Sequence, residues 1–220
     1  MATTIILTTT VNVNFNKCYI FQTDINERLN AYLKAILRWL NETNLNIVLV
    51  ENSGYKFEEL QEELEKHKDR FEIISFNEKE LDEAKYLTSD NSKGASEMFA
   101  INYAFNNSNL AKNSNFIIKI TGRYFISEFE DYIKEFNLDN YNGLTQHWKD
   151  RCEIVGSHIK NFNTIFCGFL INENGYYWGH VEGIYNYRFS LYDINTILTC
   201  KKFTIEPTQR GGINEFFSEL

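Results

Sequence analysis

The stretch from Phe116 to Ser127, FIIKITGRYFIS, restricts the fold of this chain more than any other segment. Its first half is a short apolar run rich in β-branched residues, which is typical of an inner strand that is covered on both faces. Gly122 follows, and it permits a tight turn or a close approach of the backbone. Thr121, Arg123 and Tyr124 would then be presented at the carboxyl end of a strand, where open α/β sheets bind ligands. The alternative interpretation is an ordinary strand end with one solvated arginine.

Strands and helices alternate along the chain. Apolar runs rich in β-branched residues indicate strands, and apolar residues spaced three and four apart indicate amphipathic helices. The alternation is typical of an α/β fold with a mostly parallel, mixed central sheet that helices flank. The predicted strands cover Thr4–Thr10, Leu45–Val50, Phe71–Phe76, Phe116–Ile120, Tyr141–His147, Ile154–Gly156 and Phe162–Leu170, and the predicted helices cover Asn26–Thr43, Glu58–Lys68, Lys93–Asn106 and Glu128–Phe136.

Length and composition exclude several classes of protein. A chain of 220 residues suits one core, which buries about 70% of the unfolded surface, so we expect a single domain. The net charge of -8 argues against a nucleic-acid partner, because such a partner needs Lys and Arg along a phosphate track. The four cysteines are scattered, which predicts neither a zinc module nor a disulfide framework. No apolar run reaches the ~18 residues of a membrane span, so we expect a cytoplasmic protein without a transmembrane segment.

Polar side chains follow the first two predicted strands. Thr8 and Thr10 stand at the end of the first strand, and their hydroxyls suit the edge of a base or a ribose. Glu51 follows the second strand, where a carboxylate commonly holds a ribose or a base. The alternative is a threonine-rich strand with a polar loop.

Two cationic segments could meet a phosphate. Lys93 opens a helix that Ser92 is placed to cap, so its charge adds to the positive end of the helix dipole. Arg210 precedes Gly211 and Gly212, which predicts a mobile loop that could close over a phosphate. The alternatives are a surface lysine and a simple C-terminal turn.

An aromatic cluster at Tyr176–Trp178 precedes His180 and Glu182. Sugar rings present apolar faces that pack on aromatic side chains, so an acceptor sugar is one interpretation of the cluster. A plain core segment or a hydrophobic lid is the alternative.

Taken in order, these segments resemble the GT-A glycosyltransferases, and more narrowly the small glycosyltransferase domains of chlorella-virus type and their bacterial relatives. The resemblance covers most of the chain. It is carried by Arg28 with Tyr32, Glu51–Gly54, Lys93-Gly94 with Glu97, Lys119–Tyr124 and Phe166–Phe169.

The resemblance implies a single Rossmann-like GT-A domain over residues 1–220, with a nucleotide-sugar half at 1–125 and an acceptor half with the C-terminal loop at 126–220. It implies a hexosyl- or deoxyhexosyltransferase that moves a sugar from a nucleotide-diphosphate donor, of UDP type, to a glycan acceptor. Both a retaining and an inverting reaction stay open. The alternative function is a non-catalytic carbohydrate- or partner-binding module on a transferase scaffold.

The resemblance also assigns residues to the donor site. Thr8, Thr10 and Glu51 would lie near the nucleoside. Lys93 and Glu97 would contact the ribose, phosphate or sugar. The segment Gly122-Arg123-Tyr124 would occupy the place of the family's D-x-D motif, which this sequence lacks.

Without that motif, the need for Mn²⁺ or Mg²⁺ stays open, because two close carboxylates normally hold the cation that bridges the diphosphate. Asp90 or Glu97 would be the ligand if a metal binds. Otherwise fixed cations would neutralise the diphosphate, and Arg123, Lys93 and Arg210 are the candidates. For the catalytic base of an inverting reaction we select Glu182, with His180 second.

Overall fold

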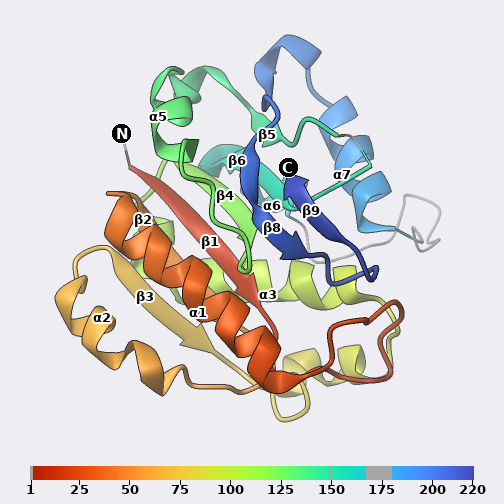
Figure 1. Cartoon of the computed structure of the whole chain (residues 1–220). Helices are drawn as coiled ribbons and strands as arrows, with labels where there is room; N and C mark the ends of the chain where they lie inside the picture. The colour runs from red at the N-terminus through yellow and green to blue at the C-terminus, as the bar shows by residue number, and fades with distance from the viewer. Residues whose placement is uncertain (1, 149, 167–179) are drawn as a thin grey trace.

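The computed structural model describes residues 2–148, 150–166 and 180–220. Over these residues, seven strands form one sheet in the order β3-β2-β1-β4-β6-β5-β7 (Figure 1). Neighbouring strands run parallel except where β6 pairs antiparallel with β4 and β5. The predicted α/β class with a mostly parallel, mixed sheet is therefore confirmed. The strands are β1 (Thr3–Thr9), β2 (Asn46–Glu51), β3 (Phe71–Ser75), β4 (Phe116–Thr121), β5 (Gly143–Thr145), β6 (Ile154–His158) and β7 (Ile197–Thr199).

The inner strands are apolar because both of their faces are covered. Along β1, Ile5 packs into one hydrophobic cluster and Ile6 into a second cluster across the sheet. The same alternation occurs along β4, where Ile118 belongs to the first cluster and Ile117 to the second. Successive side chains of a strand point to opposite faces, so a continuous apolar run marks a strand with two buried faces.

Helices cover both faces of the sheet. In Figure 1, α1 (Ile25–Glu42) and α2 (Gln61–Lys66) lie in front of the sheet, and α3 (Lys93–Asn107) lies behind it. The start of α1 is capped by Asp24, whose carboxylate accepts the Glu27 N–H at 2.9 Å. The start of α3 is capped by Ser92, whose hydroxyl accepts the Ala95 N–H at 3.1 Å. Local capping chemistry therefore fixes where both helices begin.

The remaining elements of the described chain are shorter. They are α4 (Asn109–Lys112), α5 (Phe129–Lys134), α6 (Phe162–Ile165), α7 (Val181–Ser190), a hairpin of β8 (Thr204–Gln209) and β9 (Phe216–Glu219), and single 3₁₀ turns η1 (Glu58–Leu60), η2 (Asp82–Thr88), η3 (Leu138–Asn140), η4 (Ile159–Asn161) and η5 (Ile194–Thr196).

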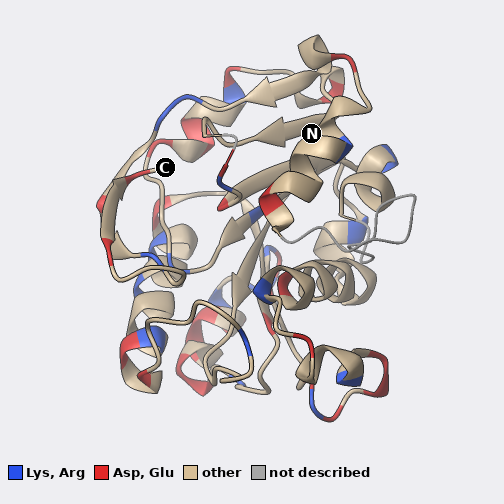
Figure 2. Cartoon of the chain, turned by 90° about the vertical axis from the view of Figure 1, so that its right-hand side faces the viewer, with Lys and Arg blue, Asp and Glu red and all other residues tan. Residues whose placement is uncertain are grey.

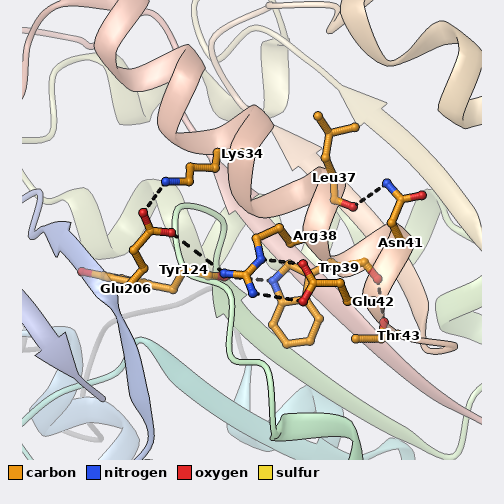
Figure 3. Close-up of polar contacts among 9 residues, drawn as sticks. All are labelled: Lys34, Leu37, Arg38, Trp39, Asn41, Glu42, Thr43, Tyr124 and Glu206. Atoms are coloured by element: carbon orange, nitrogen blue, oxygen red, sulfur yellow. Dashed lines mark hydrogen bonds and ion pairs between the residues drawn. The ribbon is translucent and has the colours of Figure 1, made fainter.

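Figure 3 shows how α1 is connected to the end of β4 and to the hairpin. The Trp39 indole N–H donates to the Tyr124 carbonyl oxygen at 2.9 Å, so the segment after β4 is tied to a buried helix residue. Glu206 on β8 pairs with Lys34, and one of its oxygens lies 3.9 Å from Arg38 Nη1. The hairpin base is thus tethered to α1 by exposed ion pairs.

One sequence-based prediction is wrong in part, and another omits two strands. The predicted strand Phe162–Leu170 begins as the helix α6, because Phe162 and Ile165 are spaced to bury one helical face. Residues 167–170 lie outside the described residues. The predicted loop at Arg210 is the turn of the β8–β9 hairpin, which the sequence analysis did not predict as strands, and the Arg210 N–H donates to the Glu215 carbonyl at 3.0 Å in it; its mobility stays a prediction. β-Branched residues such as Ile205 favour the strand, and Pro207 is tolerated in a two-stranded ribbon.

Among the described residues, no helix is long and apolar enough to cross a membrane. The single domain and its division at residue 125 stay predictions. In Figure 2, Lys and Arg positions are interspersed with Asp and Glu positions around this side of the chain.

Candidate functional site

A cavity of about 800 Å³ opens where β1, β2 and β4 end and β6 begins. It brings together eight of the residues that the sequence singled out, from both halves of the chain: Thr8, Thr10, Lys93, Glu97, Arg123, His180, Glu182 and Arg210. Four others, Glu51, Asp90, Gly122 and Tyr124, are not in its lining.

The hydroxyls at the end of β1 are held by side chains from neighbouring elements. Thr8 Oγ1 donates to Glu97 Oε1 at 2.8 Å. Thr10 Oγ1 donates to Asn52 Oδ1 at 2.6 Å. Asn52 and Ser53, which follow β2, also line the cavity. Hydroxyl and amide groups that can donate and accept hydrogen bonds therefore line this end of the cavity, together with Glu78, which accepts from Asn52 Nδ2 at 2.6 Å.

Glu51 supports this end from behind. Its side chain is fully buried, and its carboxylate accepts the backbone N–H groups of Val11 at 2.9 Å, Ser53 at 2.8 Å and Tyr55 at 2.9 Å. Burial raises the pKa of Glu51, although these hydrogen bonds act in the opposite direction. The carboxylate thus ties together the loops after β1 and β2. The sequence indicated a polar strand end correctly, but Asn52 and Ser53 are the groups that reach the cavity.

Arg28 holds the loop after β1 in the same way. Its Nε donates to the Thr10 carbonyl at 2.8 Å, and its Nη1 donates to the Gln22 carbonyl at 3.0 Å. Its Nη2 donates to the Tyr32 hydroxyl at 2.8 Å. The Arg28–Tyr32 pair of α1 therefore fixes the path of this loop along the cavity.

A buried ion pair lies at the floor of the cavity. Lys119 is the polar exception among the inner residues of β4, and its Nζ lies 2.8 Å from Glu97 Oε1. The same ammonium donates to the Cys152 carbonyl at 2.7 Å. Burial would lower the pKa of Lys119, but the negative charge of Glu97 outweighs burial and raises it. Glu97 is therefore committed to Lys119 and Thr8.

Gly122 is required because the end of β4 lies close to the end of β1. Its N–H donates to the Thr8 carbonyl at 2.9 Å. A Cβ at this position would lie 2.6 Å from Thr9 Cγ2 and 2.9 Å from the Thr8 carbonyl oxygen. The close approach delivers Arg123 to the cavity, where its guanidinium carbon lies 5.9 Å from the centre of the Tyr32 ring and 5.8 Å from that of Tyr124.

Three cations face one region of the cavity. Lys93 Nζ donates to the Tyr19 carbonyl at 2.6 Å. Burial, followed by the positive charges of Arg123 and Arg210, lowers the pKa of Lys93. The turn Gly211–Gly212 lies against two of the cations, because a Cβ on the first glycine would be 2.9 Å from Arg123 Nη2 and one on the second 3.3 Å from Lys93 Nζ. Glycines allow the turn to approach both cations closely.

Carboxylates surround the third cation. Arg210 Nε lies 3.0 Å from Glu153 Oε1, and Arg210 Nη2 lies 4.0 Å from Glu182 Oε1. The sequence analysis missed Glu153, which is buried and lines the cavity. Its only sequence signal is a charge beside Arg151 and immediately before the apolar run of β6. It reaches the site because β6 pairs antiparallel with β4, so the start of β6 lies at the end of β4.

His180 and Glu182 lie at the start of α7. His180 is exposed and precedes the helix without a side-chain capping bond, and Glu182 stands in the first turn. Cys152 Sγ lies 3.6 Å from Glu182 Oε1. The aromatic residues Tyr176–Trp178, and the glycine-containing segment 167–169, lie outside the described residues.

The carboxylates of this cavity do not fit a divalent-metal site. Among the described residues, no group of three or more His, Cys, Asp or Glu side chains is arranged to hold a metal ion. Glu97, one predicted ligand, is bound to Lys119. Asp90, the other, accepts the Ser92 N–H at 2.7 Å and is not in the lining. Carboxylates that are already neutralised by fixed cations offer a metal little net negative charge.

Comparison with solved structures identifies the fold. The glycosyltransferase GlyE of Streptococcus pneumoniae TIGR4 matches 91% of this chain with a TM-score of 0.55 and 7% sequence identity. The apo structure of the bifunctional glycosyltransferase WbbM matches 90% of it with a TM-score of 0.52 and 10% identity. The matched parts are 45% and 38% of those two chains, so this chain spans less than half of either.

No family model matches the sequence, and the comparison with curated proteins gave no match. The likeness to the two solved structures therefore shows the fold alone. The chain has a GT-A-like fold, as its sequence predicted.

Proposed function

We propose that this chain is a glycosyltransferase that moves a sugar from a nucleotide-diphosphate donor, of UDP type, to a glycan acceptor. The observation that carries the proposal is the change in polarity along the cavity. Hydroxyl and amide groups such as Thr10 and Asn52 line the end at β1 and β2, where the charges of Glu78 and Lys17 offset each other, whereas Lys93, Arg123 and Arg210 face the part beside β4 and α3. A ligand with a neutral nucleoside and an anionic diphosphate has the same sequence of groups.

The nucleoside would lie at the end of the cavity beside β1 and β2. The threonine hydroxyls, Asn52 and Ser53 can hydrogen-bond a base edge or ribose hydroxyls. Glu51 and Arg28 would act behind them, because their polar atoms are used to fix the two loops. In this proposal Glu51 positions the nucleoside site and does not contact the nucleoside.

The diphosphate would lie on the three cations. Arg123 lines the cavity in the region that Lys93 and Arg210 also face, so its guanidinium adds a third positive charge there. When the glycosidic bond breaks, negative charge develops on the leaving diphosphate, and fixed cations aimed at that position stabilise it without reorganising. Lys93, Arg123 and Arg210 would supply this stabilisation directly.

The acceptor would enter beside α7. In an inverting reaction, the acceptor hydroxyl oxygen forms a bond to the anomeric carbon while the bond from that carbon to the diphosphate oxygen breaks. A carboxylate accepts the hydroxyl proton. Glu182 is our candidate for this base, because it lines the cavity and lies next to Arg210, and exposed His180 is the second candidate.

Two assays test the proposal. Release of UDP should be detected when a suitable UDP-sugar and glycan acceptor are supplied, and UDP alone should raise the melting temperature. Ligand at ~100 times its dissociation constant stabilises the folded state by about 2.7 kcal/mol. A chain that no nucleoside diphosphate or nucleotide sugar stabilises would refute the proposal.

A variant of the central cation sharpens the test. Arg123→Ala should weaken UDP binding by roughly 10- to 100-fold, because a hydrogen bond to a charged group contributes about 1.5–3 kcal/mol. Arg38→Ala is the matched control. Arg38 belongs to α1, lies over the ring of Phe125 and is not in the cavity lining. Wild-type UDP affinity and turnover in the Arg123 variant would show that the assignment of this residue is wrong.

The second candidate is a carbohydrate- or partner-binding module that retains the fold without catalysis. It is favoured by the missing D-x-D motif and by the pairing of Glu97 and Glu153 with fixed cations. UDP binding without turnover on a broad panel of acceptors would support this candidate over the first.

A further inference from the structure

Glu153 is the buried carboxylate to which the tip of the C-terminal hairpin is attached. Its side chain is only 7% exposed, whereas that of Arg210 is 27% exposed. Arg210 Nε lies 3.0 Å from Glu153 Oε1, and Arg151 Nε lies 3.4 Å from Glu153 Oε2. The carboxylate thus joins the start of β6 to a turn that comes more than fifty residues later in the chain.

The attachment sets which atoms of Arg210 remain free. A guanidinium has N–H donors on all three nitrogens in a rigid fork. Because the ion pair with Glu153 is made at Nε, the two terminal nitrogens are left for other partners, and Nη2 lies at the long distance of 4.0 Å from Glu182. Arg210 can therefore keep its contact with Glu153 while the outer edge of its fork binds an anion.

The same contact places the rest of the turn. Gly211 and Gly212 directly follow Arg210 and lie against Arg123 and Lys93. The Phe21 N–H donates to the Gly211 carbonyl at 3.3 Å, which brings the loop after β1 to the same turn. Glu153 thus supports the part of the cavity wall that Arg210, Gly211 and Gly212 form.

The ion pair near the base of the hairpin is weaker. Glu206, near the hairpin base, pairs with Lys34, and both side chains are more than half exposed. Exposed ion pairs contribute little to stability, whereas a buried charge that loses its partner is costly. The buried contact at the tip therefore contributes more to the position of the turn than the Lys34–Glu206 pair does.

We propose that Glu153 is a positioning residue that holds Arg210, and with it the Gly211–Gly212 turn, over Lys93 and Arg123, so that the turn completes a binding site for the diphosphate of the donor. This inference rests on the proposed function. Burial would raise the pKa of Glu153, but the charges of Arg151 and Arg210 outweigh burial and lower it, so the carboxylate remains ionised at neutral pH.

Glu153→Gln tests the inference because glutamine keeps the shape and removes the charge. Titration calorimetry should show that the variant binds UDP at least 10-fold more weakly, while its affinity for uridine is unchanged. Hydrogen exchange of residues 204–219 in the free protein should be faster than in the wild type. Glu206→Gln is the control, since it changes a carboxylate of the same hairpin outside the cavity and should leave UDP affinity unchanged.

A double variant shows whether Glu153 acts through its partner. Arg210→Ala should weaken UDP binding, and adding Glu153→Gln to it should produce no further loss, because the contact is already gone. Arg210 is partly exposed, so this variant also tests the contact if the Glu153 variant folds poorly.

The outcomes separate the two proposals. If the wild type binds UDP and Glu153→Gln binds it equally well, or loses uridine and UDP affinity in equal proportion, this inference is overturned and the proposed function stands. Additive losses in the double variant overturn it as well. If the wild type binds no nucleoside diphosphate, the proposed function is overturned and this inference with it.

Discussion

Replacing Gly122 by alanine would test how closely the end of β4 must approach the end of β1. The added Cβ would lie 2.6 Å from Thr9 Cγ2 and 2.9 Å from the Thr8 carbonyl oxygen, and real contacts of a Cβ are essentially never below 3.0 Å. Thr9 cannot turn away freely, because its hydroxyl donates to the Val50 carbonyl at 2.9 Å. The strand end must therefore shift.

Forced overpacking of a core costs typically about 1–3 kcal/mol. For a chain of this size, such a loss lowers the melting temperature by roughly 2–12 °C. Thermal melts and urea titrations of Gly122→Ala should agree on a loss in this range.

Thr9→Ser provides the matched control, because serine removes Cγ2 and keeps the hydroxyl that bonds Val50. Combined with Gly122→Ala, it should restore part of the lost stability, and the remaining loss should reflect the contact with the Thr8 carbonyl, which no side-chain change removes. A coupling of about 0.5–3 kcal/mol between the two substitutions is expected for residues in contact. If Gly122→Ala melts with the wild type, or if Thr9→Ser gives no relief, the close approach is not a constraint on this fold.

Three further predictions concern charges in the cavity. The pKa of Lys93 is lowered from the ordinary 10.5, and UDP affinity should fall as the pH rises through it, because the anion binds the protonated amine. Calorimetry at several pH values should show that the Lys93→Arg variant keeps its UDP affinity over the same pH range. Lys119→Met should cost about 1.5–3 kcal/mol in urea titrations by leaving the partly exposed Glu97 without its cation, and adding Glu97→Gln should recover part of the loss. The pKa of Glu153 is lowered from 4.5. Its contribution to stability is therefore present above that value and is lost as the pH falls through its folded-state pKa. Melts at about pH 3–5, about one unit on either side of the ordinary carboxyl pKa, should show that Glu153→Gln removes this part of the acid-induced loss of stability.

The first half of the fold could be predicted because its signals are local. The strands β1, β2, β3 and β4 each contain a short apolar run with β-branched residues, and the helices α1 and α3 begin at capping residues, Asp24 and Ser92, that stand next to them in the sequence. A run of six residues with two buried faces has few alternatives. The second half offered weaker signals: α6 has four residues, and periodicity alone does not separate a strand from a helix in an apolar run this short.

The site was less predictable than the fold, because its contacts join distant segments. A carboxylate after a strand can point into a cavity or back to the chain, and the sequence does not distinguish Glu51, which accepts three backbone N–H groups, from a group that faces a ligand. Glu153 escaped notice for a related reason. Its place depends on β6 entering the sheet antiparallel beside β4, and the sequence has no local mark of strand direction.

The reversal at β6 also explains why the cavity has cations from three segments. The ends of β1 and β4 and the start of β6 meet at one edge of the sheet, where the start of α3 contributes Lys93, the residue after Gly122 contributes Arg123, and the hairpin that Glu153 holds contributes Arg210. Cations that face one region repel each other, and the lowered pKa of Lys93 is a direct result of burial and of this repulsion. Glu153 and Glu182 offset Arg210 from one side, whereas Arg123 Nε has no hydrogen-bond partner among the described residues. An anion bound between these cations would relieve the repulsion, so the electrostatics of the free site favour a ligand with more than one negative charge.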